Sequence, residues 1–103
     1  MSIQDMAQQI TEGLGSDDSG VGKTVKLDFG DDGCILIDLK NAPHTVTTED
    51  GDSDVTLKIG LEDYTKMLAG ELDGQMAFMT GKLKLEGDMG AAMAFGQYMQ
   101  TRA

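Results

Sequence analysis

The residues with the clearest chemical capacity are one thiol, one imidazole and a lysine in a glycine-containing run. Cys34 and His44 could act as nucleophile and base, but one adjoins an apolar strand and the other lies on a polar edge. The run GKT at 22–24 imitates the end of a phosphate-binding loop. Asp17 stands where that loop requires glycine, and the run opens a strand instead of a helix. We therefore expect Cys34 to be a small side chain of a strand, His44 to be a surface imidazole and the GKT run to be a plain linker. Neither catalysis nor nucleotide binding is expected.

A second candidate is a run of alternating carboxylates. Asp50, Asp52 and Asp54 are spaced like the first ligands of a calcium-binding loop. Val55 stands where that loop needs glycine, and Leu61 replaces its final glutamate. The run is therefore interpreted as a solvated hairpin turn, and no metal site or cofactor is expected.

Methionine is the unusual feature of the composition, with eight in 103 residues. Most of them fall after residue 66 in helical patterns, together with Phe78 and Phe95: Met67, Met76, Met79, Met89, Met93 and Met99. Methionine is flexible and polarizable, so it can line a groove for variable apolar guests or fill irregular gaps in a core. On composition alone, core packing is the simpler interpretation.

The elements that must position these residues follow from the apolar period. From residue 2 to 14 apolar residues recur every three or four positions, which predicts a helix that Ser2 and Asp5 can cap. Residues 15–22 hold mostly Gly, Ser and Asp and predict a flexible linker. Alternating or turn-bounded segments predict strands near 23–30, 34–41, 44–49, 54–59 and 82–86, with 44–49 at an edge because Pro43 precedes it.

Helical patterns occupy the remainder of the chain. One follows Gly60 and can end at Gly70, a short one covers 74–81, and Asp88 can cap the last. The apolar residues of the last helix cover a wider arc than packing on one sheet requires. We expect one α+β domain over 1–103, with 1–22 as its N-terminal helix and linker, and helices on one face of a mainly antiparallel sheet.

Charge and cysteine usage exclude several classes of function. The net charge is −10, which opposes the counterion release by which proteins bind nucleic acid. No basic segment opens the chain and no apolar run is long enough for a membrane span. A lone Cys34 fits a reducing compartment, so a cytoplasmic location is expected.

Residues 53–95 resemble the sterol carrier protein 2 family of non-specific lipid-transfer domains. The resemblance rests on four linked motifs in order. They are an acidic-apolar-Thr strand (54–57), an apolar helix ending in Ala-Gly (68–70), Phe-x-x-Gly-Lys-Leu-Lys (78–84) and Gly-Asp-Met-Gly-x-Ala (87–92). The hairpin from Val25 also resembles the first two strands of that family.

The resemblance implies a five-stranded mixed sheet covered by helices and enclosing an apolar tunnel, in a carrier without catalysis. The ligand would be a fatty acyl chain, acyl-coenzyme A or a sterol-like molecule, or another long apolar small molecule. The residues implied to line or border the tunnel are Leu61, Tyr64, Leu68, Met76, Phe78, Met79, Thr80, Met89, Met93 and Phe95. The alternative is a protein-interaction module whose Met-rich groove binds a partner's helix or peptide.

Membrane contact is the last expectation from charge. No Lys or Arg precedes Lys23, and the first helix carries Asp5 and Glu12. Transient membrane contact is therefore allowed but not favoured on anionic lipid, unless a local basic patch at Lys82 and Lys84 outweighs the net charge.

Overall fold

The computed structural model describes residues 2–14, 20, 22–41 and 44–102, so the predicted linker lies almost wholly outside the described residues. Helix α1 (Ile3–Leu14) forms where the apolar period predicts it. The amide of Asp5 donates to Ser2 Oγ at 3.2 Å, and the amide of Ser2 donates to Asp5 Oδ2 at 3.4 Å, which confirms the capping box. Its apolar stripe is buried, because Met6, Ile10 and Leu14 are at most 1% exposed.

Five strands form one mixed sheet, which confirms the α+β class. They are β1 (Thr24–Asp28), β2 (Cys34–Asp38), β3 (Thr45–Thr47), β4 (Val55–Ile59) and β5 (Leu83–Gly87). Their order is β3-β2-β1-β4-β5, with β1 and β4 parallel and every other pair antiparallel. A single 3₁₀ turn at Gly30–Asp32 joins β1 to β2. The segment predicted at 44–49 does lie at an edge.

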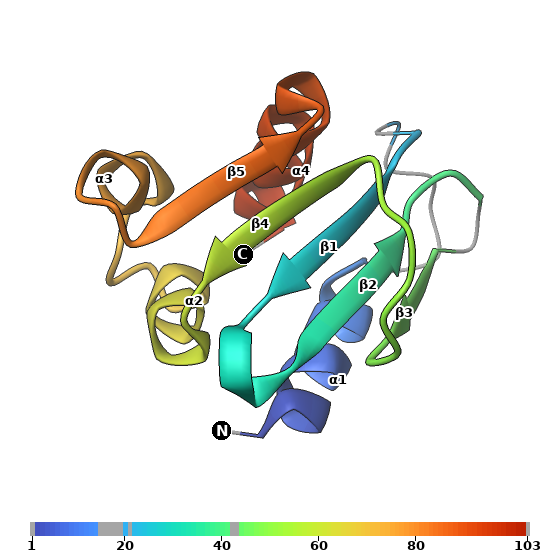
Figure 1. The fold of residues 1–103 in the computed structure, drawn as a ribbon, viewed down its shortest axis with the longest axis horizontal. Coiled ribbons are helices and arrows are strands. Elements are labelled where there is room, and N and C mark those ends of the chain that lie inside the picture. Colours follow the sequence, from blue (N-terminus) through green and yellow to red (C-terminus); the bar gives the residue numbers. More distant parts are fainter. Residues whose placement is uncertain (1, 15–19, 21, 42–43, 103) are drawn as a thin grey trace.

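The remaining helices are α2 (Leu61–Leu68), α3 (Gly74–Met79) and α4 (Met89–Arg102). Helix α1 lies against β2 and β3, α4 lies against β1, β4 and β5, and α3 lies beside β5 (Figure 1). The sheet residues predicted to face the helices are buried, as expected for strands with one wet face: Val25, Leu27, Ile35, Ile37 and Leu57.

The segment between β3 and β4 is a crossover rather than the expected hairpin turn. Since β4 pairs with β1 and β5, the chain from β3 must pass in front of the sheet to reach it (Figure 1). On the way, Asp50 Oδ1 lies 2.7 Å from Lys26 Nζ. This hydrogen-bonded pair lowers the pKa of Asp50 and raises that of Lys26. Asp50 therefore anchors a crossover, and the run is not the solvated hairpin turn that the sequence suggested.

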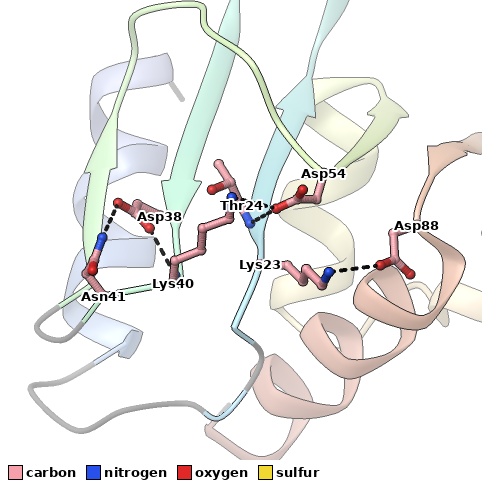
Figure 2. Close-up of polar contacts among 7 residues, drawn as sticks. All are labelled: Lys23, Thr24, Asp38, Lys40, Asn41, Asp54 and Asp88. Carbon is pink, nitrogen blue, oxygen red and sulfur yellow. Dashed lines mark hydrogen bonds and ion pairs between the residues drawn. The ribbon is translucent and has the colours of Figure 1, made fainter.

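A polar cluster joins four elements at the end of the sheet where β1 begins (Figure 2). Asp54 Oδ2 accepts a hydrogen bond from the amide of Thr24 at 2.9 Å and lies 3.4 Å from Lys40 Nζ. Lys23 Nζ lies 3.7 Å from Asp88 Oδ2, at the start of α4. Lys23 and Thr24 thus belong to the entry into a strand, which is how the GKT run was interpreted.

Candidate functional site

Five large apolar side chains lie on the surface of two helices that flank β5. On α3, Met76 is 54% exposed, Phe78 53% and Met79 73%. On α4, Met89 is 46% exposed and Met93 66%. All five belong to the predicted ligand-binding residues. We use the name exposed apolar cluster for this set of three side chains on α3 and two on α4, and large apolar groups left on a surface are candidates for a binding surface.

The local sequence explains why α3 exposes so much apolar surface. Asp73 caps the helix, because its Oδ1 accepts the amide of Gln75 at 2.9 Å. Ala77 is the buried residue of α3, and its small side chain faces inward. The Thr80 hydroxyl, predicted to border the tunnel, is exposed and donates to the carbonyl of Met76 at 2.8 Å. The hydroxyl of Thr80 therefore closes the helix end.

Helix α4 is apolar on its outward side as well as its inward side. Asp88 caps it by accepting the amide of Ala91 at 3.1 Å, as predicted. Ala91, Ala92 and Phe95 are buried, whereas Met89 and Met93 stand one turn apart and are exposed. The outward side of α1 is polar instead, with Asp5, Gln8, Gln9 and Glu12. The contrast shows that apolar exposure is particular to α3 and α4.

The other predicted site residues belong to the hydrophobic core. Leu61, Tyr64 and Phe95 are buried, and Leu68 is partly buried against them. The Tyr64 ring lies 5.7 Å from the Phe29 ring, centroid to centroid, and burial raises the pKa of its phenol. Tyr64 as a whole is 3% exposed, so it belongs to the core.

A shallow hollow of about 350 Å³ lies where β1, β4 and β5 meet the start of α2 and the end of α3. Its lining combines one carboxylate and three lysines with backbone and apolar groups: Asp28, Phe29, Gly30, Lys58, Ile59, Gly60, Gly81, Lys82 and Lys84. Lys58 and Lys84 are directly opposite in the β4–β5 register. The sequence pattern marked Lys82 and Lys84 as a basic patch, but not the contribution of Lys58, because their proximity depends on strand pairing.

Cys34 and His44 do not form a catalytic pair. Burial, with Asp50 nearby, raises the pKa of the Cys34 thiol, which disfavours the reactive thiolate. His44, expected at the surface, is 8% exposed, and its Nδ1 lies 2.6 Å from the carbonyl oxygen of Asn41. The expectation was wrong because a hydrogen bond to the backbone satisfies a ring that the end of the edge strand buries.

Two further findings concern membrane spans and metal ligands in the described ranges. Within them, no helix is long and apolar enough to cross a membrane. No group of three or more His, Cys, Asp or Glu side chains among the same residues could hold a metal ion.

Residues 7–100 match the SCP-2 sterol transfer family. The chain belongs to this family. It is therefore a lipid-binding domain, and the family resemblance found in the sequence is confirmed. The SCP-2 match extends from within α1 to most of α4, so every residue of the exposed apolar cluster lies inside it.

Solved structures of SCP-2 domains show the same fold. The sterol carrier protein domain 2 of Helicoverpa armigera is 27% identical, with a TM-score of 0.74 over 96% of this chain and 86% of that one. Palmitated SCP2L2 from Aedes aegypti is 26% identical, with a TM-score of 0.76 over 96% of this chain and 95% of that one.

Curated relatives are similar over a part of their length. Human hydroxysteroid dehydrogenase-like protein 2 is 38% identical over 76 residues, which are 72% of this chain and 18% of that protein. Peroxisomal multifunctional enzyme A of Dictyostelium discoideum is 38% identical over 66 residues, 62% of this chain and 15% of that protein. The chain spans less than a fifth of either relative, so the similarity is confined to an SCP-2 portion of each.

Proposed function

We propose that this domain is an intracellular carrier that holds a fatty acyl chain, or a similarly long apolar ligand, against α3 and α4. The supporting observation is the exposed apolar cluster, in which Met76, Phe78, Met79, Met89 and Met93 remain in contact with solvent. Each of these side chains is more than two-fifths exposed, so a ligand lying against them would remove apolar surface from water on both sides.

The hydrophobic energy of such a ligand sets how tightly it can bind. Burying roughly fourteen methylenes at about 0.8 kcal/mol each gives about 11 kcal/mol before ordering costs. Micromolar binding needs about 8 kcal/mol net, so a fully buried palmitate-length chain reaches it when the ordering costs stay below about 3 kcal/mol. A palmitated member of the family from Aedes aegypti, similar over 96% of this chain, supports palmitate as the first ligand to test.

The polar end of the ligand has a candidate partner in Tyr64. Its ring is buried on α2 beside Phe29. A carboxylate or hydroxyl headgroup that reaches it could accept a hydrogen bond from its hydroxyl. In this arrangement the methionines adapt to the chain and the phenol orients the head, which requires no catalytic group.

The experiment compares retention of a fluorescent fatty acid by wild type and two tryptophan variants. Met93→Trp places a large ring within the exposed apolar cluster, and we expect loss of retention with the fold intact by circular dichroism. Gln9→Trp puts the same ring at an exposed position of α1 and should retain the probe. Equal retention by both variants would remove Met93 from the site. A wild type that retains no probe, yields no lipid in native mass spectrometry and captures amphipathic peptides would favour the interaction module.

A further inference from the structure

The lysines of this acidic protein fall into two sets. Five of the seven are paired with carboxylates: Lys23 with Asp88, Lys26 with Asp50, Lys40 with Asp54, Lys58 with Glu86 and Lys66 with Glu62. Lys82 and Lys84 pair with no carboxylate of the described residues, and both are exposed. Among the lysines of the described residues, unpaired positive charge is therefore concentrated at the start of β5.

These two lysines adjoin α3, which carries three of the five large apolar side chains that are exposed among the described residues. The amide of Lys82 donates to the carbonyl of Ala77 at 2.9 Å, so its backbone is bonded to the end of α3. Met76, Phe78 and Met79 project from that same short helix. Large apolar side chains bordered by unpaired lysines are the combination by which a protein surface binds the interface of an anionic bilayer.

We propose that α3 and the start of β5 form the surface by which this domain docks on anionic membranes. Phe78 and Met79 enter the headgroup region, and Lys82 and Lys84 lie against lipid phosphates or carboxylates. This docking extends the proposed carrier function, since a carrier must meet a membrane to load or release a lipid. Its first measurement needs no cargo, so it can fail independently of lipid retention.

The net charge of −10 does not prevent docking at this surface. The molecule measures 33 × 27 × 26 Å, whereas the Debye length at physiological ionic strength is about 8 Å. Carboxylates at the far side are screened, and the local lysines dominate what the bilayer meets. Two carboxylates lie nearer, and lysines partly neutralise their charge. Glu86 Oε1 lies 3.0 Å from Lys58 Nζ, and Asp28 lines the adjoining hollow together with three lysines.

Helix α1 offers the competing surface, and its chemistry is unsuitable. Its outward side chains are Asp5, Gln8, Gln9 and Glu12, without a cation or a large apolar group. Anionic lipid would repel this side, and nothing on it could enter the headgroup region. The two surfaces therefore make opposite predictions for the same vesicles.

Single tryptophans distinguish the two surfaces, because the chain contains no tryptophan of its own. Met79→Trp reports on α3 and Gln9→Trp on α1, and both positions are exposed. With vesicles of phosphatidylcholine and phosphatidylserine, we expect a blue shift and quenching by brominated lipid for Met79→Trp alone. Insertion of the Gln9→Trp reporter into the bilayer would overturn the proposal. So would an unchanged Met79→Trp fluorescence with vesicles to which the protein binds in a flotation assay.

Charge is tested in the Met79→Trp background by flotation with the same vesicles. Lys82→Gln with Lys84→Gln should weaken binding roughly fivefold per lysine, or about 25-fold together. Lys23→Gln with Lys40→Gln removes the same net charge from the opposite end of the sheet and should leave binding within about twofold. If both double variants lose vesicle binding equally, or if neither loses it, the result would contradict a local lysine site.

A last control identifies other occupants of this surface. Light scattering of wild type without vesicles should give a monomer, and a dimer that Met79→Ser dissolves would assign α3 to self-association and overturn docking. Retention of the fluorescent fatty acid by Lys82→Gln with Lys84→Gln should equal that of wild type. If vesicle docking fails while retention persists, the proposed function stands and this inference falls.

Discussion

Gly87 ends β5 immediately before the cap of α4, and replacing it with alanine should destabilise the domain strongly. Its φ is +100°, a left-handed conformation that costs an L residue about 1–2 kcal/mol. A Cβ built there would lie 2.5 Å from the carbonyl oxygen of Asp54 and 3.1 Å from Cα of Val55, both backbone atoms that cannot rotate away. The Asp54 carbonyl also accepts the amide of Asp88 at 2.9 Å, so a shift would weaken a hydrogen bond worth about 1 kcal/mol.

These terms together predict that Gly87→Ala lowers the free energy of unfolding by about 3 kcal/mol. With an m value near 1.5 kcal/mol/M, the urea midpoint would fall by about 2 M. Far-ultraviolet circular dichroism measures this midpoint without a tryptophan. Because Gly87 sets the entry into α4, the same variant should also retain less fluorescent fatty acid at urea concentrations below its midpoint.

Two other glycines serve as matched controls. Gly81 has a φ of +80° with no atom within 4 Å of a built Cβ, so Gly81→Ala should cost the backbone term alone, about 1–2 kcal/mol. Gly96 lies within α4 without positive φ and with open space around it, so Gly96→Ala should stabilise by about 0.5–1 kcal/mol. A Gly87→Ala variant no less stable than Gly81→Ala would refute the reasoning from the Asp54 contact.

Three further perturbations test the core and the polar contacts. Phe95→Ala should lower the free energy of unfolding by about 3–5 kcal/mol, because the ring is 2% exposed. A loss below about 1 kcal/mol in urea titration would show that Phe95 is not a core residue. Tyr98→Phe removes the hydrogen bond from its hydroxyl to the Leu14 carbonyl, 2.7 Å long, and should cost about 1 kcal/mol; an unchanged melting temperature would contradict that link between α4 and α1. The amide of Thr24 holds the pKa of Asp54 below its ordinary 3.8, so Asp54 stabilises the fold above that pH and loses the effect as pH falls through its native pKa. Asp54→Asn should therefore be less stable than wild type at neutral pH, with a difference that shrinks under acid, and a difference independent of pH would exclude this origin.

The sequence was sufficient to predict the strands and, for those with alternating residues, the face that is buried. Alternation of period two assigns Val25, Leu27, Ile35 and Ile37 to one side, and all four are buried. This works because a strand's side chains alternate whatever strand lies next to it. Caps were also predictable, as with Ser2, since a cap depends on residues three positions apart.

Strand order and charge pairing needed the tertiary structure. The parallel pairing of β4 with β1 turns the segment at 48–54 into a crossover, and no local pattern distinguishes that from a hairpin. The pairs Lys40–Asp54 and Lys23–Asp88 join residues distant in the sequence, so composition alone could not show which lysines remain free. Formal charge counts every lysine equally, whereas a bilayer or a ligand meets those that no carboxylate neutralises.

The methionines show most clearly what the sequence predicts and what only the tertiary structure decides. Their helical spacing predicted which helices carry them, and the family resemblance selected Met76, Met79, Met89 and Met93 as site residues. Whether a methionine packs into a core or faces solvent is not encoded in its type, because its flexible thioether suits both. Only the packing of the helices on the sheet decided which methionines are exposed. Ala77 and Ala92 allow close approach with their small side chains, and the larger side chains beside them remain exposed to solvent.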